Sequence, residues 1–83
     1  MEVILRSIAN KEYLRLNEPI KGRIEQALEK LSCDPPKGDI KKLVGGDGYR
    51  VRVGDYRILY DMDGERITVY GIKPRGQAYK GGQ

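Results

Sequence analysis

Apolar and polar residues alternate along two short runs in the middle of the chain, Tyr49–Val53 and Tyr56–Tyr60. Alternation built from β-branched and aromatic residues is typical of β-strands. The two residues between the runs, Gly54 and Asp55, suit the tight turn of a hairpin. The pattern therefore predicts a β-hairpin at the centre of the fold.

A two-residue loop determines which residues face each other across the hairpin. Counting outward from it gives the pairs Val53 with Tyr56, Arg52 with Arg57, Val51 with Ile58, Arg50 with Leu59 and Tyr49 with Tyr60. One face is then apolar, and the other collects three arginines. Like charges that directly oppose each other destabilise a sheet, so the pair Arg52 and Arg57 favours an anion bound between the guanidinium groups. The alternative is a solvated face whose arginines splay apart or reach Asp55 or Asp61.

Apolar residues before the hairpin follow a helical spacing. Ala9, Tyr13 and Leu16 predict a helix from Ala9 to Leu16, with Ser7 as its N-terminal cap. Proline is favoured at the first position of a helix, so Pro19–Leu31 predicts a second one. The apolar stripe of this second helix lies opposite charged residues, as expected for a helix packed on a core.

Two further strands are expected, at Glu2–Arg6 and at Arg66–Ile72, the latter after a tight turn at Asp63-Gly64. That turn predicts that Ile67 faces Tyr60. Residues 37–48 are expected to form an ordered loop with at most one helical turn. The predicted fold is therefore α+β with element order βααβββ, in which a helix pair packs on one face of a mostly antiparallel four-stranded sheet.

The composition excludes several kinds of chemistry. The 83 residues allow one domain, expected at residues 1–80, with residues 81–83 as a disordered tail. Histidine is absent, and the single Cys33 is expected to be a packing residue, so neither a disulfide, a structural metal nor a cofactor is expected. The glycines of residues 45–48 lack the Gly-Lys-Ser/Thr ending of a phosphate loop. No signal peptide or membrane span is apparent, which predicts a cytoplasmic protein.

The net charge of +4 is concentrated in the second half of the chain. Residues 1–36 hold six Lys and Arg against six Asp and Glu, whereas residues 37–83 hold ten against six. Such a basic region favours nucleic acid or an acidic protein as the partner.

Three motifs extend this pattern over almost the whole chain: the loop Pro36-Lys37-Gly38-Asp39-Ile40-Lys41-Lys42-Leu43, the run Tyr49–Tyr60, and a closing Arg75-Gly76-x-x-Tyr79. Together with the order of elements, they resemble RelE toxins of the RelE/ParE superfamily. The resemblance implies a toxin of a type II toxin–antitoxin pair that enters the ribosomal A site and cleaves mRNA there without a metal. An acidic antitoxin would bind the toxin and block this activity.

By the same resemblance, the catalytic residues would be Arg50, Arg52, Arg57, Arg75 and Tyr79. Arg57 and Arg50 would hold the phosphate, Arg75 would protonate the leaving oxygen, and Tyr79 would stack on a base. Several relatives carry lysine at the position of Arg52, and a guanidinium is a poor proton acceptor. Three alternatives follow: catalysis rests mainly on orientation and electrostatics, a neighbouring carboxylate assists, or the protein is slow or inactive. The predicted RNA-binding residues are Lys37, Lys41, Lys42 and Tyr70, and Tyr70 is expected opposite Arg57.

Two alternatives to the ribonuclease remain open. One is a ParE-like inhibitor of DNA gyrase that shares the fold. The other is a catalytically weak RelE relative that only binds RNA or antitoxin, which the arginine at position 52 keeps possible.

Overall fold

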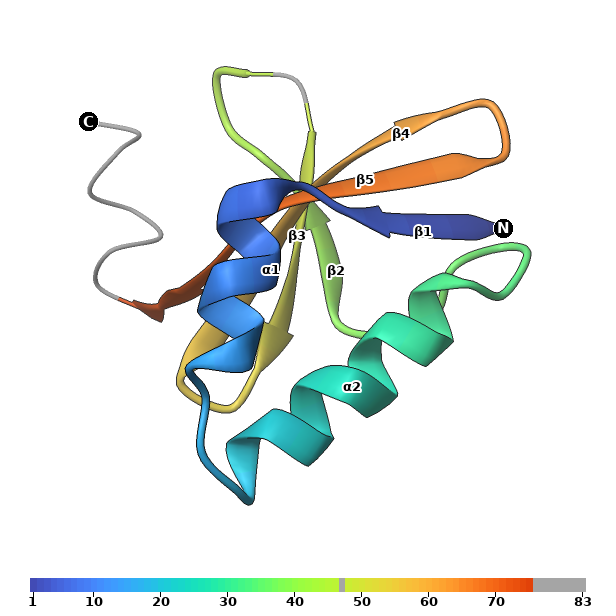
Figure 1. Cartoon of the computed structure of the whole chain (residues 1–83). Coiled ribbons are helices and arrows are strands. Elements are labelled where there is room, and N and C mark those ends of the chain that lie inside the picture. The colour runs from blue at the N-terminus through green and yellow to red at the C-terminus, as the bar shows by residue number, and fades with distance from the viewer. Residues whose placement is uncertain (47, 76–83) are drawn as a thin grey trace.

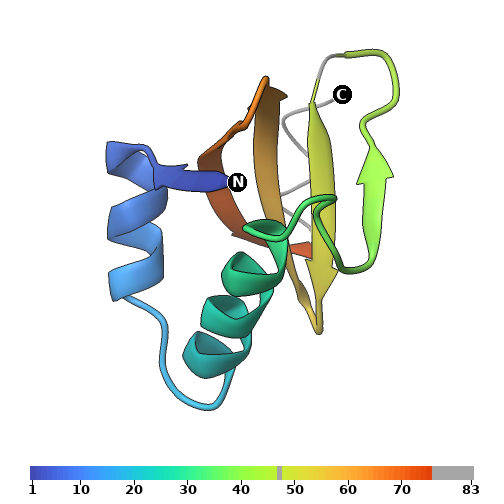
Figure 2. The same ribbon diagram turned by 90° about the vertical axis from the view of Figure 1, so that its right-hand side faces the viewer.

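Five strands and two helices are formed by residues 1–46 and 48–75, the part of the chain that the computed structural model describes (Figure 1). In chain order the elements are β1 (Glu2–Leu5), α1 (Ser7–Leu14), α2 (Ile20–Leu31), β2 (Ile40–Lys42), β3 (Tyr49–Val53), β4 (Tyr56–Asp63) and β5 (Arg66–Pro74). The strands form one sheet in the order β1-β5-β4-β3-β2. Only β1 and β5 pair in parallel among these neighbours. Both helices lie on the same side of the sheet (Figure 2). The predicted α+β class and the N-terminal helix pair are confirmed.

The hairpin of β3 and β4 has the predicted register at all of its pairs. Val53 faces Tyr56 and Arg52 faces Arg57, and the pairing continues to Tyr49 and Tyr60. Gly54 has a φ of 58°, the conformation that a type II′ turn requires at its first central residue. Because glycine adopts a positive φ without steric cost, this turn fixes the register locally.

The predicted register of β4 and β5 is wrong. Asp63 pairs with Arg66, so the turn is formed by Gly64 and Glu65, one residue later than expected. Ile67 therefore faces Met62 instead of Tyr60. Gly64 has a φ of 62° and occupies the same position in its turn as the glycine of the first hairpin. The core face is preserved because the change in register is even.

A β-bulge then shifts the second half of this pairing. Tyr60 faces Val69, whereas the adjacent Leu59 faces Gly71, so Tyr70 is the extra residue of β5. As a result Lys73 faces Arg57, and the prediction that Tyr70 faces it is wrong. A bulge inserts one residue into a single strand, which a count outward from the turn does not anticipate.

The short edge strand β2 was not predicted, because residues 37–48 were expected to form a loop. Ile40 pairs with Val51 and Lys41 pairs with Arg50. Three residues are too few to show a periodic pattern, so this strand depends on its neighbour β3 rather than on local preference. The sheet therefore has five strands instead of the expected four.

The helices begin and end close to their predicted limits. Helix α1 already includes Ser7, and its N-cap is Arg6, without a side-chain hydrogen bond, so the predicted capping role of Ser7 is wrong. It ends at Leu14, two residues before the expected end. Helix α2 begins after Pro19 and ends at Leu31, as predicted within one residue. Neither helix is long and apolar enough to cross a membrane.

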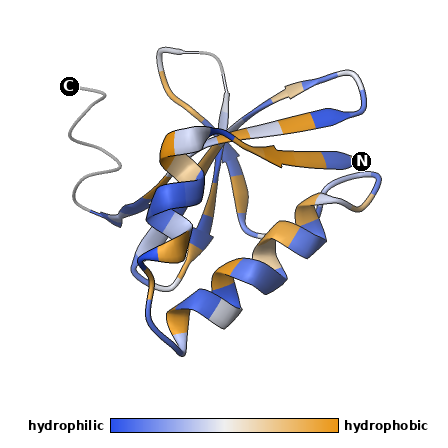
Figure 3. Cartoon of the chain, viewed as in Figure 1, coloured by the Kyte–Doolittle hydropathy of each residue, from blue (hydrophilic) through white to orange (hydrophobic). Residues whose placement is uncertain are grey.

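The core lies between the helices and the sheet. Its buried members are Ala9, Ile24, Leu31, Val51, Val53, Ile58, Tyr60, Ile67, Val69 and Ile72. Hydrophobic and hydrophilic residues are interspersed along the helices and strands, as burial of one side requires (Figure 3). The opposite face of the sheet carries the polar residues that alternate with the core residues.

Candidate active site

Four arginines, one lysine and one aspartate line a small cavity of about 130 Å³, here called the arginine cleft. Its lining residues are Asp39, Lys41, Arg50, Arg52, Arg57 and Arg75. Side chains alternate between the two faces of a strand, and Val51 and Ile58 belong to the core. The arginines of β3 and β4 therefore lie on the face that the helices leave open.

Arg57 is the buried member of the cleft, with 2% of its surface exposed. Its Nη1 donates hydrogen bonds to the carbonyl oxygens of Tyr56, at 3.0 Å, and Gly54, at 3.5 Å. The turn of the hairpin thus holds this guanidinium in place. A guanidinium whose position is already set loses little side-chain entropy when it binds an anion.

The electrostatics of the cleft favour an anion. Burial lowers the pKa of Arg57 below its usual value, and the charges of Arg52, Arg50 and Arg75 lower this pKa further, in that order. Asp39 acts in the opposite direction. A bound anion would counter both the desolvation and the mutual repulsion, since opposite charges stabilise the cationic form.

Arg75 reaches the cleft because the end of β5 is tied to the first hairpin. Its backbone N–H donates to the carbonyl oxygen of Asp55 at 2.7 Å, and the preceding Pro74 pairs with Tyr56. These contacts bring Arg75 beside Arg57, although 17 residues separate the two in the sequence. The predicted grouping of Arg50, Arg52, Arg57 and Arg75 is present in the fold.

Asp39 is the acidic residue that the sequence reasoning did not single out. It immediately precedes β2, and its backbone carbonyl accepts a hydrogen bond of 3.1 Å from the N–H of Arg52. Among the described residues it is the one carboxylate that lines the arginine cleft. Asp55 and Asp61, the carboxylates named in the alternative of a solvated arginine face, do not line it. Asp39 was missed because its place in the cleft depends on the pairing of β2 with β3, which was not predicted.

The predicted RNA-binding residues are dispersed. Lys41 lines the cleft, whereas Lys37 lines a neighbouring groove of about 300 Å³ between α2 and β3. Lys42 is exposed on the edge strand opposite Tyr49. Tyr70 is half-buried outside the cleft lining, and its pKa is raised by burial and then by the charge of Asp61. The predicted catalytic Tyr79 and the expected tail lie outside the described residues.

Lys73 faces Arg57 but is paired elsewhere. Its ammonium group contacts the carboxylate of Glu12 in α1, which also accepts a hydrogen bond of 2.9 Å from the backbone N–H of Ile72. This carboxylate covers the edge of β5 beyond the end of β1, where a backbone donor would otherwise face solvent. The charge of Lys73 is thus largely balanced, which leaves the arginines as the source of positive potential.

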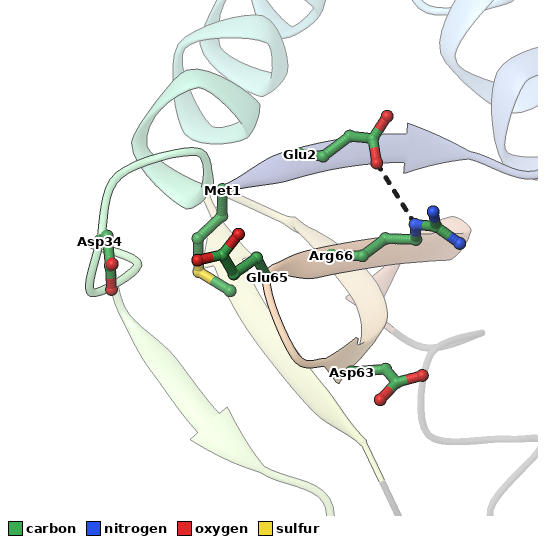
Figure 4. A pocket seen from close by; sticks show the side chains of 6 residues that line it. All are labelled: Met1, Glu2, Asp34, Asp63, Glu65 and Arg66. Carbon is green, nitrogen blue, oxygen red and sulfur yellow. Dashed lines mark hydrogen bonds and ion pairs between the residues drawn. The ribbon is translucent and has the colours of Figure 1, made fainter.

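A larger pocket of about 690 Å³ lies at the other end of β4 (Figure 4). It is lined by Met1, Glu2, Asp34, Asp63, Glu65 and Arg66. Its one guanidinium, that of Arg66, is 3.3 Å from the carboxylate of Glu2. Four carboxylates make this pocket unsuited to phosphate. In residues 1–46 and 48–75, no group of three or more His, Cys, Asp or Glu side chains is arranged to hold a metal ion.

Comparisons with known proteins give a consistent family. Residues 2–79 match the family model described as the ParE toxin of the type II toxin–antitoxin system, parDE. A search of curated proteins found no match.

Solved structures extend the similarity to the fold. The RelE–RelB complex from Pyrococcus horikoshii OT3 contains a chain that is 31% identical, with 92% of this chain and 96% of that chain covered and a TM-score of 0.76. The RelB–RelE antitoxin–toxin complex from Methanococcus jannaschii matches at 27% identity, 93% and 95% coverage and a TM-score of 0.76. The RelBE complex from E. coli, at 20% identity, 88% and 94% coverage and a TM-score of 0.73, shares the fold.

Proposed function

Because this chain belongs to the RelE/ParE superfamily of toxins from type II toxin–antitoxin systems, we propose that it is an endoribonuclease that cleaves mRNA in the ribosomal A site. The single observation that carries the proposal is the arginine cleft. Its four guanidinium groups converge on a space large enough for one phosphate group, on the open face of the sheet. Planar guanidinium groups match the oxygens of phosphate, and they need no metal to do so.

The proposed reaction is attack of a ribose 2′-oxygen on the adjacent phosphorus. The bond from phosphorus to the 5′-oxygen breaks, which yields a 2′,3′-cyclic phosphate and a 5′-hydroxyl end. Negative charge grows on the phosphate oxygens during this attack, so preorganised cations accelerate it. Arg57 and Arg50 hold these oxygens, and the fixed position of Arg57 makes it the principal contact.

The remaining positions supply the other requirements of the reaction. Arg75 donates a proton to the departing 5′-oxygen, as general acid catalysis requires. Tyr79 stacks against a base and aligns the strand, as aromatic side chains do for single-stranded RNA. Lys41 adds positive charge at the rim of the cleft. A guanidinium is a poor proton acceptor, so the role of Arg52 is to orient the phosphate and not to act as the base.

An acidic antitoxin is the proposed protein partner, together with the ribosome and its message in the cytoplasm. The support comes from relatives that were solved as RelB–RelE complexes. The basic second half of this chain offers such a partner a surface of opposite charge.

A second candidate function follows from the matching family model, which is described as ParE. It is inhibition of DNA gyrase by a non-enzymatic toxin. A gyrase inhibitor that is not an enzyme has no need of a phosphate-sized cleft lined by four arginines. The arginine cleft therefore favours the ribonuclease.

Induced expression of the whole chain separates these functions. We expect translation to stop and primer extension on ribosome-bound message to reveal new 5′ ends, without DNA damage. Arg57→Ala and Arg75→Ala should restore growth while the purified variants remain folded. Arg15→Ala, which removes an exposed arginine outside the cleft, is the control and should stay toxic. DNA damage with intact message would support the gyrase inhibitor, and full toxicity of both folded cleft variants would refute the site.

A further inference from the structure

Among the described residues, the arginine cleft is lined by five cationic side chains that can hold a phosphate and by one carboxylate, that of Asp39. RNA cleavage by a 2′-hydroxyl needs a proton acceptor. We infer that the carboxylate of Asp39 takes the 2′-hydroxyl proton, an inference that rests on the proposed RNA cleavage and assigns its missing base. The other lining groups are excluded from this role, because guanidinium and ammonium groups are donors without an acceptor site.

The local structure fixes Asp39 beside the phosphate position. Its carbonyl oxygen is bonded to the N–H of Arg52, so its backbone is attached to the strand that carries two of the cleft arginines. The preceding Gly38 has a φ of 133°, and a Cβ atom there would lie 3.1 Å from Cγ2 of Val51. Glycine has no Cβ atom, so it can approach Val51 this closely, and the loop therefore lies against β3. Asp39 is therefore positioned by β3 rather than by a freely moving loop.

The location of Asp39 also gives it access to substrate. It is exposed, and it lines both the arginine cleft and the neighbouring groove that contains Lys37. An RNA strand whose scissile phosphate sits among the arginines would place its adjacent ribose at the rim of the cleft. A proton acceptor is needed at that ribose and not at the phosphate itself.

The proposed step balances in atoms and electrons. The Asp39 carboxylate takes the proton of the 2′-hydroxyl, and the electron pair left on the 2′-oxygen forms the new bond to phosphorus. The bond between phosphorus and the 5′-oxygen breaks, and the 5′-oxygen receives a proton from Arg75. Exchange of one proton with water at each residue restores the starting state.

A simpler role for Asp39 is that of a counter-ion. Its charge favours the cationic form of Arg57, against the effect of the three other arginines. The two roles predict different outcomes when the charge is removed. In both, Asp39→Asn makes the cleft more positive and should bind RNA phosphate at least as tightly as before. A counter-ion is dispensable for cleavage, whereas a base is required.

The experiment measures cleavage and binding separately. Purified whole chain and its variants are mixed in excess with ribosomes that carry a defined message, and the single-turnover cleavage rate is determined. Binding is measured to the same ribosomes with a message whose scissile ribose lacks the 2′-hydroxyl. We expect Asp39→Asn to cleave about 100-fold more slowly or worse, in keeping with the usual value of a general base. Its affinity for the uncleavable message should be unchanged or higher.

Two further variants keep the test decisive. Asp39→Glu retains a carboxylate and should cleave within about tenfold of the natural chain, while Asp63→Asn, which removes an exposed carboxylate at the other end of β4, should cleave normally. Normal cleavage by folded Asp39→Asn would overturn the inference and leave the ribonuclease intact. Absence of cleavage by the natural chain would instead overturn the proposed function.

Discussion

Arg52 and Arg57 face each other directly across β3 and β4, yet they differ in burial. Arg57 has 2% of its surface exposed and is bonded to the hairpin turn, whereas Arg52 is exposed. The pair combines one guanidinium with a set position and one that is free to follow a ligand. Like charges at such a position lower the stability of a sheet.

Replacement of Arg52 by glutamate should therefore stabilise the fold and abolish the proposed RNA cleavage. The like-charged pair becomes an opposite-charged one, which is worth about 0.5–1 kcal/mol in the free energy of unfolding. The same change places a second carboxylate in the cleft and repels phosphate. Urea unfolding measures the first effect, and cleavage of ribosome-bound message measures the second.

Arg15→Glu makes the same change in net charge outside the cleft and should leave the proposed RNA cleavage unchanged. A less stable Arg52→Glu protein would show that Arg52 makes a contact that outweighs the repulsion.

Gly48→Ala should destabilise the protein by on the order of 2 kcal/mol. Gly48 has a φ of 110°, and a Cβ atom there would lie 2.7 Å from Oδ1 of Asp61 and 3.1 Å from the carbonyl oxygen of Tyr60. Both the backbone conformation and the lack of space oppose a side chain. Gly46→Ala is the matched control, since no atom lies within 4 Å of its added Cβ. Thermal unfolding of the two variants compares them, and equal melting temperatures would contradict this account.

Leu31→Ala should cost about 2–5 kcal/mol of unfolding free energy. Leu31 is 0% exposed in the core, so its removal leaves a cavity between α2 and the sheet. Leu14→Ala is the control from α1, where 60% of the leucine surface is exposed, and it should change the stability by less than about 0.5 kcal/mol. Urea unfolding measures both losses, and the dependence of the unfolding free energy on urea concentration should be the same in the two variants. A similar loss of unfolding free energy in both variants would contradict the packing of α2 on the core.

Stability should fall above pH 10, and Tyr60→Phe should reduce that fall. Burial, followed by the nearby Tyr49, raises the pKa of Tyr60 above its ordinary value of 10.0. The unfolded chain therefore ionises first, so the contribution of Tyr60 is complete below pH 10 and is lost as the pH rises through the pKa of the folded state. Urea unfolding at pH 9 and pH 11 measures the slope. The slope does not vanish in the variant, because the pKa of Tyr13 and that of Tyr70 are raised as well. An unchanged slope would rule out Tyr60 as a contributor.

The first hairpin could be predicted completely because local chemistry determines it. Gly54 supplies the turn, and alternation confirms the register. The second hairpin uses the same rule, with Gly64 followed by an acidic residue, but the prediction placed its turn one residue too early. The bulge at Tyr70 has no local signal in the sequence and lies just beyond the residues of β5 that pair with β1.

The candidate site was predictable in its arginines and not in its carboxylate. Arg50, Arg52 and Arg57 share a face by strand alternation alone, and Arg75 came from the family resemblance. Asp39 enters the cleft through the pairing of β2 with β3, a contact between segments that show no shared pattern in the sequence. Tyr79, which came from the same resemblance, lies outside the described residues.

The parallel pairing of β1 with β5 joins the first strand of the chain to the last one described. β1 therefore finds its place in the sheet only after β5 has been synthesised, and such distant pairing is slow to form. A nascent chain has no assembled cleft while most of its length is still being translated. RNA cleavage, the proposed activity, therefore requires that nearly the whole chain has been synthesised.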